Sequence, residues 1–251
     1  MDRKVIDDYI MYWNQASIKV LDIRYEVLEV GDILHTYRLP ASMFLYSTGG
    51  DAKVQLDQTA YHLKGFQLMH AGKGALLTIV ATDEAFKYYL VFYEGVIPTP
   101  SRPKEIDHLK RNNPFQKQYH FTPSYPIALL DKLQEMYEKW KEQAPLTNFN
   151  VKTLFYQFIN QVLTELHQKG IEVKEPDLTA QVRLYIQENY SESIHLESLA
   201  ETFSYSAAHL SVMFKHCTSY SPIDYLIRIR LDKAASLLAE TDASIRDIAT
   251  S

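Results

Sequence analysis

Two short helical segments separated by a three-residue break most constrain how the C-terminal part of this chain folds. Apolar residues recur at helical spacing over Leu196–Phe203, about two turns, and again after Ser206 as far as about Cys217. The break is Ser204–Ser206, and Ser206 is a favourable N-cap for the second segment. Two short helices joined by so brief a turn match the helix-turn-helix, whose second helix enters the DNA major groove.

Both segments have an apolar face that would close this hairpin. The expected inward residues are Leu196, Leu199 and Ala200 on the first segment and Leu210, Met213 and Phe214 on the second. A helix over Leu178–Tyr190 precedes the pair, and a long one follows from Pro222 to about Glu240. The stripe expected to be buried on the long helix consists of Tyr225, Leu226, Leu231, Ala234, Leu237 and Leu238.

The first hundred residues have a different pattern. After a short helix over Val5–Trp13, the stretch from Ser17 to about Val96 is rich in β-branched and aromatic residues and is cut by frequent turn signals. Six or more short strands are expected, with candidates such as Ile33–Leu39, Met43–Ser47, Lys53–Leu56, Phe66–Met69, Ala75–Ala81 and Phe86–Tyr93. Strands of this spacing indicate a sandwich, jelly roll or small barrel.

A connecting region lies between the two patterns. Ile97–Pro123 is rich in proline and charge and sustains neither a helix nor a central strand. Two amphipathic helices follow, with apolar stripes over Leu129–Trp140 and Leu154–Leu166, and Lys169-Gly170 ends the second. The stripes pack either against their own domain or against a second copy of the chain. The expected domains are 1–98, 99–176 and 177–251.

Composition restricts where and how the chain works. It has 251 residues, 46% of them hydrophobic, with a net charge of −5 and no apolar run long enough to span a bilayer. The charged N-terminus is unlike a secretory signal, and the single cysteine, Cys217, cannot form an internal disulfide. We therefore expect a cytoplasmic protein that does not enter a membrane. Any DNA binding must be local, and within Ser204–Lys233 four basic side chains stand against two acidic ones.

The C-terminal part, about the last 75 residues, resembles the AraC family (AraC/XylS) of bacterial transcription regulators. The residues that carry the resemblance are Leu196–Ala200, His209–Lys215, Ser221-Pro222, Tyr225-Leu226, Arg230-Leu231, Ala234, Leu237, Leu238 and Ser244–Ala249. The resemblance implies an α+β chain: a cupin-like β jelly roll that binds an effector, connecting helices that dimerise, and an all-α, homeodomain-like helix-turn-helix domain. The family has two helix-turn-helix units, whereas this sequence stops inside the second, so we expect a fragment of a longer regulator.

The resemblance and the helical spacing together nominate the DNA-contacting residues. They are Ser206, Ala207, Ala208, His209, Ser211, Val212, Lys215, Arg228 and Arg230. Small or apolar side chains at 208, 211 and 212 predict weak base reading biased towards A·T steps. The basic residues either contact phosphates or are solvated side chains paired with Asp224 or Asp232. Ser219 stands where the family usually has glycine, which predicts a strained left-handed residue there.

An enzymatic alternative rests on the histidines of the β domain. His35, His62 and His70 invite a metal-dependent cupin reading, but the chain has no His-x-His pair to place ligands on one strand face. No cofactor, metal or nucleophile motif is expected. A non-DNA-binding interaction module is the remaining alternative. The stretch Phe44–Ala81 is a candidate lining for a polar effector pocket, with no ligand named, and the homodimer and the effector remain expectations.

Overall fold

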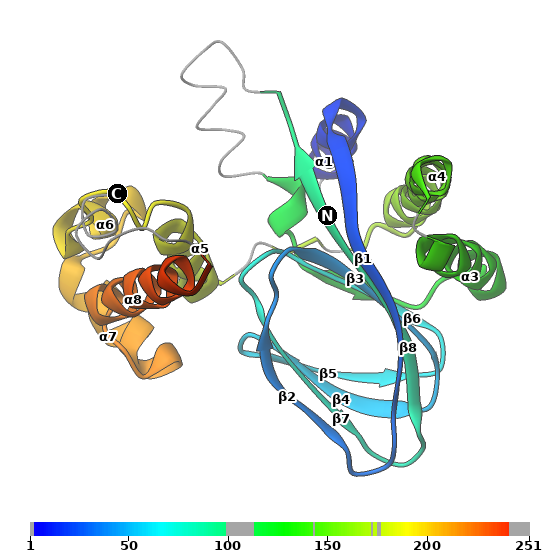
Figure 1. The fold of residues 1–251 in the computed structure, drawn as a ribbon, viewed down its shortest axis with the longest axis horizontal. Helices are drawn as coiled ribbons and strands as arrows, with labels where there is room; N and C mark the ends of the chain where they lie inside the picture. Colours follow the sequence, from blue (N-terminus) through cyan, green and yellow to red (C-terminus); the bar gives the residue numbers. More distant parts are fainter. Residues whose placement is uncertain (1–2, 99–112, 143, 172, 175–176, 241–251) are drawn as a thin grey trace. The chain divides into compact units, whose positions relative to one another are not determined.

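The computed structural model describes residues 3–98, 113–142, 144–171, 173–174 and 177–240. The chain divides into two compact units, Met1–Pro176 and Asp177–Ser251, which are described separately (Figure 1). In the part of the chain that is described, no helix is both long and apolar enough to cross a membrane. The Ser244–Ala249 segment of the family resemblance lies outside the described residues, as does most of the proline-rich connector.

The first unit is a jelly roll made of two antiparallel sheets (Figure 1). The five-stranded sheet runs, in spatial order, β1 (Ser17–Leu28), β8 (Phe86–Val96), β3 (Ser42–Gly49), β6 (Gln67–Ala71) and β9 (Tyr119–Phe121). The four-stranded sheet runs β2 (Ile33–Arg38), β7 (Leu76–Ala81), β4 (Asp51–Leu56) and β5 (Thr59–Lys64). The α+β class and the N-terminal β domain expected from the sequence are confirmed.

The period-two alternation of the strands gives the five-stranded sheet two buried faces. On β8, Tyr88 and Leu90 point between the sheets, while Tyr89 and Val91 point to the opposite face. The inner layer is almost wholly apolar; its members from β3, β4, β6 and β7 are Met43, Leu45, Ala52, Val54, Leu56, Met69, Ala71, Leu77, Ile79 and Ala81. The inward side chains of Phe44–Ala81 in the inner layer are therefore mainly apolar, unlike the polar lining suggested for this stretch.

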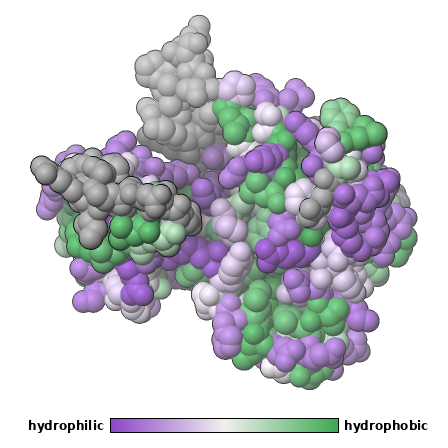
Figure 2. All heavy atoms as spheres, viewed as in Figure 1, coloured by the Kyte–Doolittle hydropathy of each residue, from purple (hydrophilic) through white to green (hydrophobic). Residues whose placement is uncertain are grey.

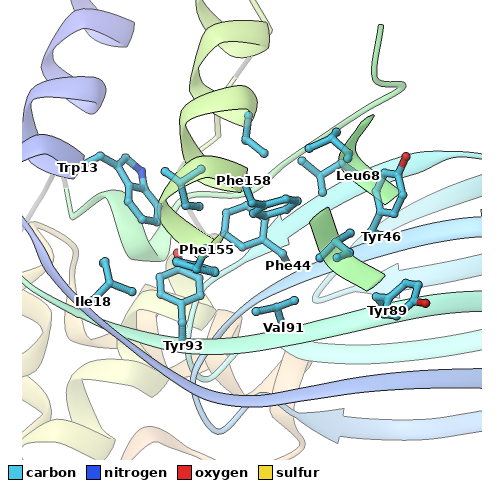
Figure 3. Packing of buried hydrophobic residues seen from close by; sticks show 14 of the residues in the cluster. Trp13, Ile18, Phe44, Tyr46, Leu68, Tyr89, Val91, Tyr93, Phe155 and Phe158 are labelled. Atoms are coloured by element: carbon cyan, nitrogen blue, oxygen red, sulfur yellow. The ribbon is translucent and has the colours of Figure 1, made fainter. Parts of the chain in front are cut away.

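Three helices cover the outer face of the five-stranded sheet: α1 (Arg3–Gln15), α3 (Pro126–Glu142) and α4 (Pro145–Lys169). Figure 3 shows Phe155 and Phe158 of α4 meeting Phe44 and Tyr93 of the sheet. The Phe44 ring lies 5.2 Å from that of Phe158 and 5.5 Å from that of Tyr93. The apolar stripes of α3 and α4 are therefore packed within their own unit.

Three strands were not among the predicted ones. β1 intersperses charged residues among its apolar ones, and β5 is short and mostly polar. β9 lies inside the predicted connector and, as an edge strand, pairs only with β6, after a short 3₁₀ turn (η1, Pro114–Gln116). This is the position at which a proline-rich segment can still join a sheet.

The described residues of the second unit form four helices: α5 (Leu178–Glu188), α6 (Leu196–Thr202), α7 (Ala207–Thr218) and α8 (Pro222–Glu240). Its core joins α5 and α6 to α7 and the first turns of α8; the fully buried members are Val182, Ile186, Leu199, Ala200, Leu210, Phe214, Tyr225 and Leu226. The predicted helix boundaries agree with these within about two residues.

The prediction of a buried stripe on α8 is wrong for three of its six residues. Tyr225 and Leu226 are buried, but Leu231 is 63% exposed, and Leu237 and Leu238 are 39% and 48% exposed. The reason is that the core of this unit uses only the first two turns of α8, ending at Ile229. Figure 2 shows hydrophobic surface over this helix.

Candidate nucleic-acid interface

The second helix of the hairpin, α7, has well-defined ends. Ser206 is its N-cap, and its hydroxyl accepts a hydrogen bond from the backbone N–H of His209 at 3.3 Å. At the other end Ser219 takes the left-handed conformation, with φ of 65°, and its N–H bonds to the carbonyl of Lys215. Both features were predicted. Ser204, in the turn before α7, is also left-handed, with φ of 61°, and was not predicted.

The inner face of α7 is held against the helices around it. Leu210 and Phe214 are fully buried, and the Phe214 ring meets that of Tyr225 edge-on at 5.5 Å. Ala200 on α6 is buried as well, and its small side chain lets the two helices approach, as expected. Because this face is fixed, the opposite face of α7 is presented to solvent in a single orientation.

The exposed face of α7 carries most of the predicted contact residues. Ala208, His209, Val212 and Lys215 are exposed, and Val212 is 72% exposed. The remaining two predicted α7 residues differ: Ser211 is half-buried, and Ala207 is half-buried against the core of the unit. A single exposed apolar residue is common on protein surfaces, so Val212 by itself does not identify a partner.

Arg228 and Arg230 of α8 have different hydrogen-bond partners. The Nη1 of Arg228 donates to the Tyr220 hydroxyl, and its guanidinium lies 4.9 Å from the centre of that ring. Arg230 donates from Nε to the carbonyl of Tyr190 and from Nη2 to that of Glu192, both at 2.7 Å. Arg230 therefore ties α8 to the loop between α5 and α6.

The pairing with acidic residues considered for these arginines is not what the structure has. The carboxylate of Asp224 accepts a hydrogen bond from the Ser221 hydroxyl at 2.7 Å. Lys233, the last basic residue of the stretch, lies 6.0 Å from the Tyr190 ring, on the same side as Arg230. Among the described lysines and arginines of Ser204–Lys233, Lys215 and Arg228 thus lie nearest to α7.

The three histidines considered for a metal site lie in different surroundings. His62 bonds to the buried carboxylate of Asp51 at 2.6 Å; a hydrogen bond from Thr82 and this one from His62 lower the pKa of that carboxyl. His70 is fully buried, whereas His35 is exposed. Among the described residues, no group of three His, Cys, Asp or Glu side chains is placed to hold a metal ion.

His70 lies in a polar contact inside the five-stranded sheet. Its Nδ1 is 2.7 Å from the carbonyl of Lys117, and its Nε2 is 2.6 Å from the Tyr93 hydroxyl. A carbonyl only accepts, so Nδ1 carries the proton and Nε2 accepts from Tyr93. Burial lowers the pKa of His70 to about 3 against the opposing hydrogen bond to Lys117, so the ring is neutral.

The geometry of the second unit defines its class. A capped α7 packed across α6, with one face free, is a helix-turn-helix. A helix-turn-helix domain model matches residues 199–251. Over its C-terminal part, the chain is similar to transcription regulators of the AraC/XylS type.

Individual relatives are similar over part of their length. The transcriptional activator RhaS of Enterobacter sp. (strain 638) is 36% identical over 81 residues, which are 32% of this chain and 29% of RhaS. The activator Btr of Bacillus subtilis (strain 168) is 25% identical over 155 residues, 60% of this chain and 26% of Btr. The chain thus spans less than a third of either relative. Among solved structures, ToxT from Vibrio cholerae aligns over 92% of this chain and 88% of its own, with 12% identity and a TM-score of 0.45.

Proposed function

We propose that this chain is a sequence-specific DNA-binding transcription regulator and no enzyme, acting in the cytoplasm on double-stranded DNA. In this proposal α7 is the recognition helix. The observation that carries it is the exposed face of α7, on which Val212 stands 72% exposed while Leu210 and Phe214 anchor the other side. A helix fixed on one face and free on the other is what the major groove requires.

The side chains on that face determine what the helix reads. Ala208 and Val212 offer only methyl groups, which contact the C5-methyl of thymine, and the Ser211 hydroxyl pairs with either class of base. Because Ser211 is half-buried, it contributes less to base contacts than Ala208 and Val212 do in this proposal. We therefore propose modest specificity that favours thymine-containing steps. Lys215 and Arg228 supply phosphate contacts, which give affinity but no sequence information.

The first unit, in this proposal, senses a small-molecule effector or sets the oligomeric state. Because the side chains between the sheets are apolar, an effector that bound among them would be hydrophobic rather than polar. The effector remains unnamed because the described side chains between the sheets include no convergent set of polar groups that would select one.

We further propose that the homodimer forms through the outward face of α4. From Thr153 to Thr164 this helix has no charged residue, although half of it faces solvent. A surface groove runs along it, lined by Lys132 of α3 and by Thr153, Tyr156, Gln157, Asn160, Gln161 and Thr164 of α4.

The neighbouring helix gives the contrast. The 17 residues of α3 include seven charged ones, Asp131, Lys132, Glu135, Glu138, Lys139, Lys141 and Glu142. Depletion of charge is the compositional mark of an interface core. At the start of α4, Leu146 and Phe149 are 73% and 67% exposed and add apolar surface to the same helix. The apolar stripes first considered for dimerisation are buried within the unit, so the outward face takes that role here.

Selection from a randomised duplex pool, followed by sequencing, tests the DNA-binding proposal without a known operator. We expect the chain to enrich a short motif containing thymines at defined spacing. The variant Val212→Asp, whose carboxylate repels phosphates from an exposed position, is the matched control and should enrich none. Failure of the parent chain to enrich any motif, or to retain duplex DNA at low salt, would contradict the proposal.

A further inference from the structure

The turns on either side of α7 are built alike. Each contains Ser-Tyr-Ser, at 204–206 and at 219–221. In each, the first serine is left-handed, with φ of 61° at Ser204 and 65° at Ser219. The last serine of each starts the next helix by accepting a backbone N–H at its hydroxyl. The repeated geometry places one exposed tyrosine at each end of α7.

At the N-terminal end, the tyrosine stacks on a histidine. The ring of Tyr205 is 46% exposed and lies parallel to the His209 imidazole, with 5.4 Å between ring centres and 10° between planes. The backbone of His209 is already fixed, because its N–H is bound by the Ser206 cap. The stack fixes the side chain as well.

At the C-terminal end, the tyrosine holds an arginine. Tyr220 is 39% exposed, and its hydroxyl accepts a hydrogen bond from Arg228 while its ring lies under the guanidinium at 4.9 Å. Arg228 is two turns into α8, so this contact draws its charge back to the α7–α8 turn. Without it, a long side chain on an exposed helix would sample many rotamers.

The length of α7 relates these two ends to DNA. Its 12 residues span about 18 Å at 1.5 Å per residue, longer than the roughly 12 Å width of the major groove. When such a helix enters the groove, its two ends come within side-chain reach of the phosphates that border it. Phosphate contacts at both ends fix how the helix sits while bases are read.

We propose that Tyr205 and Tyr220 are positioning residues for DNA binding. Tyr205 holds the His209 ring, and Tyr220 holds the Arg228 guanidinium, so that each donates to a phosphate at one end of α7. Because the side chains of His209 and Arg228 are already held in place in the free protein, less conformational entropy is lost when DNA binds. This inference rests on the proposed DNA-binding function and adds residues that the sequence reading had not included among the contacts.

A double-mutant cycle on the full chain tests the C-terminal pair. The measured quantity is the affinity for a mixed-sequence duplex, followed by fluorescence anisotropy at several salt concentrations. Arg228→Gln should lower the slope of log affinity against log salt by about 0.9, because one phosphate contact is lost. Tyr220→Leu should weaken binding about threefold to tenfold with the slope retained, because the charge stays but is no longer held.

The decisive result is the combination. In the Arg228→Gln background, Tyr220→Leu should cost nothing further, since the residue it positions is gone. The same should hold for Tyr205→Leu in a His209→Gln background. Tyr220→Phe, which keeps the ring and loses the hydroxyl, should fall between the parent and Tyr220→Leu. Tyr125→Leu, an exposed tyrosine of the first unit, is the control and should bind as the parent does.

The possible outcomes distinguish a failure of the positioning roles from a failure of the proposed DNA-binding function. If the parent chain binds duplex DNA and the tyrosine variants bind equally well, the positioning roles are wrong and the regulator proposal stands. If the loss caused by Tyr220→Leu persists in full without Arg228, the tyrosine acts in another way and the inference fails. If the parent shows no affinity even at low salt, the proposed function itself fails.

Discussion

Arg228 and Arg230 stand two positions apart on α8 and leave it in opposite directions. Two residues correspond to about 200° around an α-helix, so the side chains cannot serve one surface. Arg228 turns to Tyr220 beside α7, whereas Arg230 reaches the carbonyls of Tyr190 and Glu192. The two arginines therefore have different roles: Arg228 contacts the turn after α7, and Arg230 ties α8 to the α5–α6 loop.

Replacing Arg230 should affect stability. Arg230→Ala removes two charge-assisted hydrogen bonds from the α5–α6 loop, and we expect the free energy of unfolding of the second unit to fall by about 1 kcal/mol, a figure discounted for the exposure of the side chain. Arg228→Ala, its matched control, should change stability by less than about 0.5 kcal/mol. Urea denaturation of both variants measures this. Equal stability losses would contradict the division of roles.

The two left-handed serines predict a gain in stability. Ser204→Gly and Ser219→Gly should each raise the free energy of unfolding by about 0.5–1 kcal/mol, because glycine adopts positive φ without the steric cost of a Cβ atom. Ser236→Gly, in the exposed part of α8, is the control and should destabilise by a similar amount, since its conformation is helical. Thermal denaturation distinguishes the two directions, and a loss at Ser219→Gly would refute the strain argument.

Several of these features could be predicted from the sequence, and others could not. Ser219 was predicted to be left-handed because glycine is usual there, and Ser206 because a serine before a helical pattern is a common cap. The bonds of Arg230 could not be predicted, because a carbonyl 40 residues away leaves no mark in a local pattern. The exposure of Leu231 could not be predicted for the same reason. The apolar periodicity of α8 indicates a buried face, but it does not indicate how far along the helix the core of the unit extends.

In the β unit, too, some features could be predicted from the sequence and others could not. Along β8, apolar and aromatic residues occupy both alternating sets of positions, and both faces of the strand are buried in the structure. β9 was missed because its pairing with β6 depends on two segments about 50 residues apart being brought together. Composition suggested Phe44–Ala81 as a candidate lining for a polar pocket, whereas the alternation along β4 directs its Lys and Gln side chains away from the buried layer.

His70 predicts how stability depends on pH. Its pKa is about 3 in the folded chain, against 6.5 for an unperturbed histidine, so between these values the unfolded chain binds more protons. The free energy of unfolding should therefore fall as pH drops below about 6.5, by at most about 1.4 kcal/mol per pH unit down to about pH 3. At neutral pH and above the full contribution is present.

The variant His70→Gln isolates this effect. Compared with the parent chain, it should lose that part of the pH dependence and cost about 1–3 kcal/mol at neutral pH through imperfect hydrogen bonds to Lys117 and Tyr93. His35→Gln, at an exposed position, should keep the parent's pH profile. Denaturation curves measured across this pH range test the prediction. If the slope of unfolding free energy against pH is unchanged in His70→Gln, the ring of His70 is not a buried neutral base.

The uncharged face of α4 predicts self-association. Placing like charges there, as in the double variant Gln157→Lys and Asn160→Lys, should convert a dimer to a monomer at tens of micromolar, because two copies would bring four ammonium groups together. Glu135→Lys, on the charged face of α3, should leave the dimer intact. Sedimentation velocity gives the masses. A parent chain that is monomeric at these concentrations would refute the α4 interface.

Contact between Val212 and thymine methyl groups is the claim on which the account of α7 depends. The most direct measurement is the affinity for a duplex enriched by selection, compared with the same duplex carrying uracil in place of thymine. The parent chain should bind the uracil duplex more weakly, and Val212→Ser should show a smaller difference, because the apolar contact is already lost. Equal affinity of the parent chain for both duplexes would contradict base reading by this helix.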